Sequence, residues 1–249
     1  MLTQPLLDKL TQLRLTAFRA ALEEQLHNPQ YVDLSFEDRL GLLVDVECTH
    51  RDNNRLKRRL KTARLPLPAT IEDLDMSASR GLDRGLVLHL AQGEWINQHL
   101  NILVLGPTGV GKTFLTCSLA HSACRHDFTV RYYRTSRLLH HIHLAHADGS
   151  YPKLLDTFAR TQLSIFDDWL RDPLTRSQSQ DLLEILDDRY GRSATLAATQ
   201  VPVSEWHARF PDPTIGDAIL DRLIHNAYRL NLQGESRRKV DSPLPMSTT

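Results

Sequence analysis

The sequence predicts an α/β protein in which helices flank a parallel β-sheet, preceded by a small all-helical N-terminal domain. Three observations predict it. A glycine-rich stretch at residues 106–113 lies between an apolar run and a helical pattern, short β-rich runs alternate with helical patterns after residue 86, and the first 65 residues show helical spacing only. Strands that alternate with helices form right-handed crossover units, which makes neighbouring strands parallel.

The N-terminal region carries apolar residues at helical spacing. The first of these are Leu6, Leu10, Leu13 and Ala17. Pro29 interrupts the pattern, and Ser35 with Asp38 three residues later resembles a capping box that opens a further helix. A third helical run precedes Pro66 and Pro68, which we expect to end it. We therefore expect a helical domain at 1–65 and a linker at 66–85.

The remaining chain shows the alternation of an α/β domain, which we place at 86–240 with a disordered tail at 241–249. Strands are expected at 101–105, 128–133, 163–166 and 194–198, with a last short one at 228–232. Helices are expected at 114–125, about 136–147, about 178–190 and 217–222.

Composition limits the class of protein. Lysine plus arginine and aspartate plus glutamate both total 30, so any nucleic-acid contact must come from a local patch. Three cysteines are too few for a disulfide framework, and Cys117 and Cys124 share a helix face that we expect in the core. No signal peptide or membrane-spanning run is evident, which leads us to expect a cytoplasmic protein without membrane contact.

The glycine-rich stretch fits the phosphate-binding pattern G-x-x-x-x-G-K-[ST] at every fixed position. It consists of Gly106, Pro107, Thr108, Gly109, Val110, Gly111, Lys112 and Thr113. Glycines let backbone N–H groups surround a phosphate, and the helix that follows adds its positive end. Lys112 is expected to reach the β- and γ-phosphates of ATP, and the Thr113 hydroxyl to bind Mg²⁺.

Two carboxylates follow the strand at 163–166. We expect Asp167 to hold Mg²⁺ through water and Asp168 to act as a general base, or to orient the attacking water. Gln200 follows the next strand and either positions that water or has no role. Arg222, on the helix at 217–222, either reaches the nucleotide of a neighbouring subunit or is a surface arginine. One of the arginines of 234–239 either contacts the γ-phosphate bound by its own chain or is likewise a surface arginine.

A basic segment occupies residues 51–64, where only Asp52 is acidic. Its cations are Arg51, Arg55, Lys57, Arg58, Arg59, Lys61 and Arg64. On a helix, the arginines at 51, 55, 58 and 59 share one side, while Leu56, Leu60 and Ala63 face a core. Such a stripe is either a solvated face or a surface that binds duplex DNA without reading bases, since no aromatic residue interleaves it.

Together these residues resemble the IstB-type helper ATPases of bacterial insertion sequences, in the AAA+ superfamily and close to the DnaC/DnaA-like helicase-loader group. The resemblance covers residues 5–240. The matching stretches are 51–61, 80–83, 106–113, 166–169, 181–190, 217–222 and 234–239. It implies nucleotide-hydrolysis roles for Lys112, Thr113, Asp167 and Asp168 and a sensor role for the segment that ends at Gln200. It also implies an arginine finger at Arg222 and a second sensor arginine at Arg238.

The resemblance implies ATP-dependent assembly of a homo-oligomer, a ring or spiral, on duplex DNA, followed by recruitment and stimulation of a partner transposase. ATP and Mg²⁺ are the implied cofactors, and hydrolysis would drive disassembly. A replicative helicase loader shares the fold and motifs, but the basic N-terminal region favours transposition. A small-molecule P-loop kinase would leave Arg222 and residues 234–239 without a role.

Two features stand apart from these assignments. The family commonly has glycine where this chain has Leu170, which leaves open whether hydrolysis is slowed. Four histidines cluster on one predicted helix: His140, His141, His143 and His146. No two of them are four residues apart, as the histidines of a helical zinc motif are, so we interpret them as surface histidines.

Overall fold

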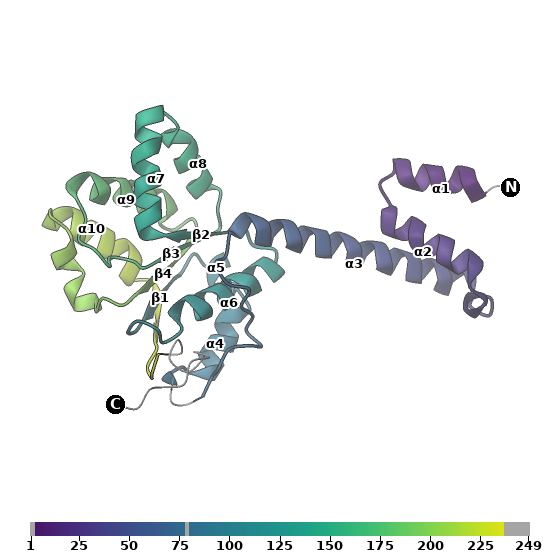
Figure 1. Cartoon of the computed structure of the whole chain (residues 1–249), viewed down its shortest axis with the longest axis horizontal. Coiled ribbons are helices and arrows are strands. Elements are labelled where there is room, and N and C mark those ends of the chain that lie inside the picture. The colour runs from purple at the N-terminus through teal and green to yellow at the C-terminus, as the bar shows by residue number, and fades with distance from the viewer. Residues whose placement is uncertain (1–2, 78–79, 237–249) are drawn as a thin grey trace, which may run out of the picture. The chain divides into compact units, whose positions relative to one another are not determined.

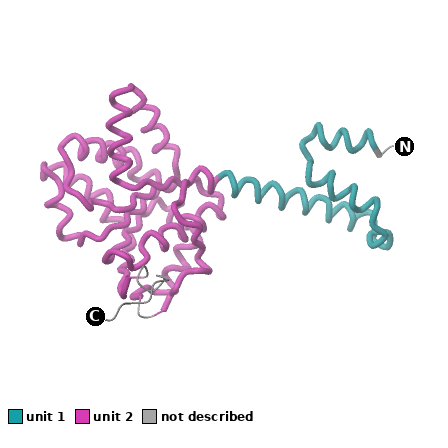
Figure 2. The backbone as a smooth tube through the Cα atoms, in the orientation of Figure 1, with its two compact units in different colours: residues 1–58 teal, residues 59–249 magenta. Residues whose placement is uncertain are grey.

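The computed structural model describes residues 3–77 and 80–236 (Figure 1). The chain forms two compact units, residues 1–58 and residues 59–249 (Figure 2). The second unit therefore begins before the segment at 66–85 that composition marks as a linker. The predicted sensor arginine Arg238 and the predicted tail lie outside the described residues.

The first unit is helical: α1 (Thr3–Gln12), α2 (Thr16–His27), a 3₁₀ turn η1 (Pro29–Tyr31) and the start of α3 (Phe36–Ala63). The apolar spacing over residues 6–17 continues through the break between α1 and α2. The chain breaks there because Arg14 adopts a left-handed conformation, with φ of 57°. The capping prediction is confirmed, since the Ser35 Oγ accepts a hydrogen bond from the Asp38 amide at 3.1 Å.

Helix α3 spans what the sequence divides into two helical runs, because no residue between them breaks the helix. Within the first unit it fixes α2 through one carboxylate. Glu47 accepts hydrogen bonds from the Phe18 amide (3.0 Å), the Ala17 amide (3.1 Å) and Arg51 Nε (2.7 Å). These donors, the Phe18 amide foremost, hold the pKa of Glu47 below its usual value despite burial. Glu47 thus satisfies free N–H groups at the start of α2.

The second unit contains the predicted parallel sheet. Its strands are β1 (Asn101–Leu105), β2 (Val130–Arg134), β3 (Leu163–Asp167), β4 (Ala194–Thr199) and β5 (Ala227–Asn231). All pairs are parallel, in the order β2-β3-β4-β1-β5. The carboxyl ends of β1, β3 and β4 therefore meet at one edge.

Helices cover both faces of the sheet. Those after β1 are α6 (Lys112–Arg125), α7 (Thr135–Asp148), α8 (Tyr151–Ala159), α9 (Arg176–Arg189) and α10 (Pro213–Ile224), and two 3₁₀ turns, η3 (Val203–Glu205) and η4 (His207–Arg209), precede α10. Before β1 lie α4 (Arg84–Ala91) and α5 (Glu94–Asn97). The sequence patterns did not predict α4, α5 or α8. Within the described residues, no helix is both long and apolar enough to traverse a bilayer.

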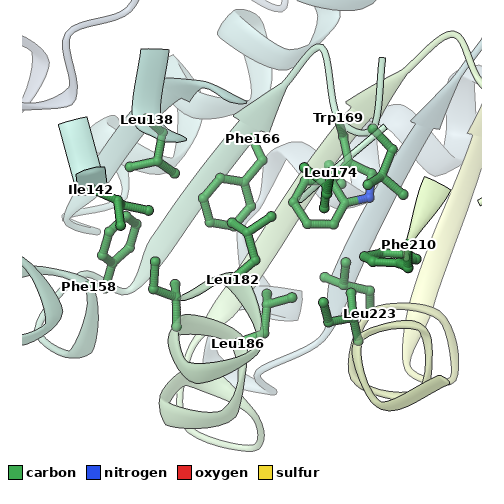
Figure 3. Packing of buried hydrophobic residues seen from close by; sticks show 14 of the residues in the cluster. Leu138, Ile142, Phe158, Phe166, Trp169, Leu174, Leu182, Leu186, Phe210 and Leu223 are labelled. Carbon is green, nitrogen blue, oxygen red and sulfur yellow. The ribbon is translucent and has the colours of Figure 1, made fainter. Parts of the chain in front are cut away.

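The main apolar core lies between the sheet and helices α7 to α10 (Figure 3). Phe166 from β3 and Trp169 just after it are fully buried, with ring centroids 5.6 Å apart. Helix α6 covers the other face, where Cys117 and Cys124 are buried as predicted. The core therefore continues up to the residues that follow Asp168.

Arg189, at the end of α9, is a fully buried cation. Its guanidinium donates to the carbonyls of Phe158 (2.7 Å), Thr161 (2.8 Å) and Ala194, and to the Thr195 hydroxyl (3.2 Å). Burial lowers the pKa of Arg189 to about 10, so the side chain stays charged at neutral pH. One side chain thus joins α8, α9 and the start of β4.

We expect Arg189→Met to lower the free energy of unfolding by about 3 kcal/mol, because buried acceptors left without a donor cost about 1–3 kcal/mol each. Urea unfolding followed by tryptophan fluorescence measures the change, since Trp95, Trp169 and Trp206 all lie in the second unit. The matched control is Arg192→Met, at an exposed position, which should change stability by less than about 0.5 kcal/mol. Equal effects of the two variants would contradict the role given to Arg189.

Candidate functional site

The functional site lies at the edge where three parallel strands end. The phosphate-binding loop follows β1, the two aspartates end and follow β3, and Gln200 follows β4. They enclose a cavity of about 270 Å³. Its lining includes Thr108, Gly109, Gly111, Lys112, Thr113, Phe114, Asp167, Asp168 and Gln200. The structure therefore brings together the residues that the sequence predicts for nucleotide binding and hydrolysis, except the two arginines described below.

The loop depends on glycine for its shape. Gly106, Gly109 and Gly111 have φ of 150°, 86° and 99°. A Cβ at Gly106 would lie 2.5 Å from the Leu232 carbonyl oxygen, so only glycine fits there. Lys112 begins α6, and its Nζ donates to the Gly106 and Pro107 carbonyls at 2.8 Å each. The lysine charge is thus already inside the loop, beside the positive end of α6.

Asp167 is the most tightly held carboxylate at the site, and only 4% of it is exposed. Its Oδ2 accepts from the Thr113 hydroxyl at 2.7 Å and from the Tyr132 hydroxyl at 2.6 Å. Its Oδ1 accepts from the Asp168 amide at 2.9 Å. The Thr135 hydroxyl also donates to the Asp167 carbonyl at 2.9 Å. The end of β3 is therefore fixed by α6, β2 and the start of α7.

Asp168 is more accessible and points into the same cavity. Its carboxylate pairs with Arg134 Nε at 2.7 Å and lies 3.7 Å from Arg171. This pairing raises the pKa of Arg134. Asp168 has φ of 55°, a left-handed conformation that aspartate and asparagine adopt more readily than most residues.

Sequence reasoning missed Tyr132 and Arg134, which both contact the aspartates from β2. Strand alternation places positions 132 and 134 on the same face of β2, and β2 pairs with β3 so that Arg134 lies opposite Asp167. In the sequence, these residues are visible only as two polar side chains two positions apart at the end of a predicted strand. Assigning them to the site requires the knowledge that β2 lies next to β3.

Gln200 lines the same cavity as the aspartates. Its Oε1 accepts a hydrogen bond from the Thr108 hydroxyl, so β4 is linked to the phosphate-binding loop. The preceding Thr199 is buried and donates to the Trp169 carbonyl at 2.6 Å. Trp169 in turn donates its amide to the Ala198 carbonyl at 2.9 Å. The end of β4 thus positions the chain that follows Asp168.

Part of the cavity wall comes from the segment that composition marks as a linker. It contributes Leu67, Leu74, Asp75, Arg80 and Leu82. The Arg80 guanidinium is nearly buried and donates to the Val110 carbonyl of the phosphate-binding loop. Three leucines beside a phosphate-binding loop form an apolar surface of the kind that accommodates a nucleotide base.

The remaining predicted arginines are placed elsewhere. Arg222, on the last turn of α10, is paired with Asp187 of α9 and donates to the Ala218 carbonyl at 2.7 Å. It does not line the cavity in its own chain. Arg238 lies outside the described residues.

The basic segment contains two kinds of cation. Arg51, Arg55 and Arg59 form ion pairs with Glu47 (2.7 Å), Asp52 (2.5 Å) and Asp127 (2.6 Å), respectively. The other members are exposed and form no ion pair with any residue that the structure describes. They are Lys57, Arg58, Lys61 and Arg64.

The sequence profile of the IstB-like ATP binding protein family matches residues 8–243. The chain belongs to this family. It is 46% identical over 239 residues to a Sinorhizobium fredii protein named for ATP binding in an insertion sequence, with 96% of this chain and 98% of that protein covered. A Mycobacterium tuberculosis protein with a similar name is 30% identical, with 95% and 94% covered.

Solved structures of known proteins share the fold. The DnaC helicase loader matches with a TM-score of 0.56 and 16% identity, covering 71% of this chain and 99% of that one. DnaA from Aquifex aeolicus, bound to AMPPCP, matches with a TM-score of 0.56 and 15% identity, covering 71% of this chain and 54% of that one. The IstB-like chain therefore has an AAA+ fold of the DnaC/DnaA type, with insertion-sequence ATP-binding proteins as its relatives.

We expect Gly106→Ala to weaken ATP binding by about 10- to 100-fold, because a displaced loop loses at least one charged hydrogen bond of about 1.5–3 kcal/mol. Titration with a fluorescent ATP analogue measures the affinity. The matched control is Gly149→Ala, where φ is also positive (76°) but no atom lies within 4 Å of the added Cβ. That variant should lose about 1 kcal/mol of stability and keep its ATP affinity. An equal loss of affinity in both variants would show that backbone strain, rather than the close approach to Leu232, is responsible.

Proposed function

We propose that this IstB-like protein is an ATPase that assembles on duplex DNA as an oligomer and recruits and stimulates a partner transposase. The observation that carries the proposal is the meeting of Lys112, Asp168 and Gln200 around one cavity, in a chain whose relatives are insertion-sequence ATP-binding proteins. Its direct test is ATP hydrolysis with and without duplex DNA. Stimulation by DNA is the expected result, and hydrolysis that depends on a small metabolite instead would support a kinase.

The site suits ATP with Mg²⁺. The Thr113 hydroxyl and the Asp167 carboxylate are hard oxygen donors 2.7 Å apart beside the phosphate-binding loop, as Mg²⁺ prefers. Bound Mg²⁺ would neutralise charge on the β- and γ-phosphates. Lys112 and the N-terminal amides of α6 would hold the phosphates, and the leucines at 67, 74 and 82 would contact the base.

Hydrolysis requires that Asp168 accept a proton from water, or orient the water. In this structure its carboxylate pairs with Arg134 at 2.7 Å, so part of the Arg134 interaction must be given up as the water binds. Gln200, which lines the same cavity, would orient the same water. These roles agree with the partial exposure of both side chains.

Assembly would complete the site from outside the chain. Arg222 would contact the γ-phosphate bound by a neighbouring subunit, and Arg238 would contact the phosphate of its own chain. Removal of the γ-phosphate would then release the neighbour's contact and loosen the oligomer. The basic segment 51–64 would bind the phosphates of duplex DNA, mainly through the cations that form no ion pair with the described residues.

We expect Asp168→Asn to bind ATP with near wild-type affinity and to hydrolyse it about 100- to 10,000-fold more slowly, the usual contribution of a general base. The variant should remain on duplex DNA after ATP is added, because the γ-phosphate persists. Asparagine also tolerates the positive φ at this position, which preserves the fold.

Dissociation of this variant from labelled DNA, followed over time after competitor is added, measures the effect. Asp172→Asn is the control, since this exposed carboxylate pairs only with Arg171 among the described residues. If Asp168→Asn dissociates as fast as wild type while hydrolysis is lost, hydrolysis is not the step that releases DNA.

We expect the double variant Lys57→Gln/Arg58→Gln to bind duplex DNA more weakly and with less salt dependence. Each phosphate contact contributes a slope of about 0.9 to the dependence of log affinity on log salt, so the slope should fall by up to about 1.8. Fluorescence anisotropy at several salt concentrations measures it. Lys153→Gln/Arg192→Gln removes the same charge from exposed positions elsewhere. If both double variants weaken binding equally, the loss is due to net charge rather than to a contact at these positions. If Lys57→Gln/Arg58→Gln has no effect, these two residues do not contact DNA.

A further inference from the structure

The hydroxyl of Tyr132 contacts the carboxylate proposed to hold Mg²⁺. It donates to Asp167 Oδ2 at 2.6 Å, across the boundary between β2 and β3. Nothing in the phosphate-binding motif requires a tyrosine there, and the motifs that assign roles to Thr113 and Asp167 assign none to Tyr132. The contact is therefore a separate feature of this site.

Asp167 needs several donors because its charge is almost removed from water. Three hydrogen bonds reach its carboxylate, from Thr113, Tyr132 and the Asp168 amide. Under the proposed function Thr113 binds the metal itself, and the backbone amide is fixed by the chain. Tyr132 is then the side chain among these donors whose effect is confined to orienting Asp167.

In its contact with Asp167 Oδ2, the Tyr132 hydroxyl is the donor. Burial, followed by this hydrogen bond, raises the pKa of the phenol above its ordinary value.

We propose that Tyr132 is a positioning residue that fixes Asp167 and thereby sets the affinity of the site for Mg²⁺ in the presence of nucleotide. The inference rests on the proposed ATP–Mg²⁺ site and adds to it a residue on a different strand. Groups that orient a metal-binding side chain typically change metal affinity by about 10- to 100-fold when removed. The effect is confined to metal-dependent binding, because Tyr132 does not line the nucleotide cavity.

The adjacent residue offers a matched control. Tyr133 also lies on β2, and its hydroxyl is buried with no hydrogen-bond partner among the described residues. Its ring packs against Phe158 in the core, with centroids 4.7 Å apart. Tyr133→Phe and Tyr132→Phe therefore remove the same atom from the same strand, but only the second removes a bond to Asp167.

The test is Mg²⁺ titration of nucleotide binding, with a fluorescent ATP analogue and purified full-length protein. We expect Tyr132→Phe to need about 10-fold more Mg²⁺ for half-maximal binding, with unchanged affinity in EDTA. Tyr133→Phe should titrate like wild type. A Tyr132→Phe titration that matches wild type overturns the inference, as does an equal loss of affinity with and without Mg²⁺, which indicates a structural role.

A double-variant cycle shows whether the effect passes through Asp167. In an Asp167→Asn background, Tyr132→Phe should change Mg²⁺ dependence by less than about 2-fold, and a change as large as in the wild-type background contradicts the inference. Wild-type protein whose nucleotide binding ignores Mg²⁺ would overturn the proposed metal site itself, and the inference with it. If wild type and Tyr132→Phe respond equally to Mg²⁺, the role of Tyr132 is rejected. The proposed function is then unaffected.

Discussion

The site is organised around one buried carboxylate. Asp167 places a carboxylate at a position that is 4% exposed, and a carboxylate removed from water is stable only when donors surround it. Those donors come from Thr113 at the start of α6, Tyr132 on β2 and the next amide of its own chain. The requirement to satisfy this carboxylate therefore holds the start of α6 and strands β2 and β3 in one arrangement.

Local patterns predicted most of the sheet and the centre of the site. Residues 106–113 are recognisable because glycine conformation, lysine charge and hydroxyl position are each required by phosphate and metal chemistry. Tyr132 and Arg134 were missed because their partners depend on strand order, which local periodicity does not encode. The break at Arg14 was missed for a related reason: apolar spacing continues through a residue whose backbone leaves the helical region.

The segment at 66–85 and Leu170 show how tertiary contacts change the meaning of a residue. Prolines and sparse leucines in that segment are typical of a linker, yet several of its side chains line the nucleotide cavity. Leu170 has φ of 51°, a left-handed conformation that glycine adopts more readily than leucine. Here the strain of about 1–2 kcal/mol is offset by a side chain that is 1% exposed, whose removal from a core costs about 2–5 kcal/mol. Leucine is therefore a stable alternative that keeps the turn after Asp168.

The intrachain partner of Arg222 bears on how assembly is controlled. Its side chain is 28% exposed and that of Asp187 is 45% exposed, and ion pairs at such positions contribute only about 0–1 kcal/mol. A phosphate in a partly enclosed site between subunits would bind the same guanidinium more strongly, through charge-assisted and often bidentate hydrogen bonds. Exchange of Asp187 for a neighbour's γ-phosphate is thus favourable only while that phosphate is present. Under the proposed function, the ion pair keeps Arg222 ordered in the free chain without opposing assembly, and hydrolysis returns it to Asp187.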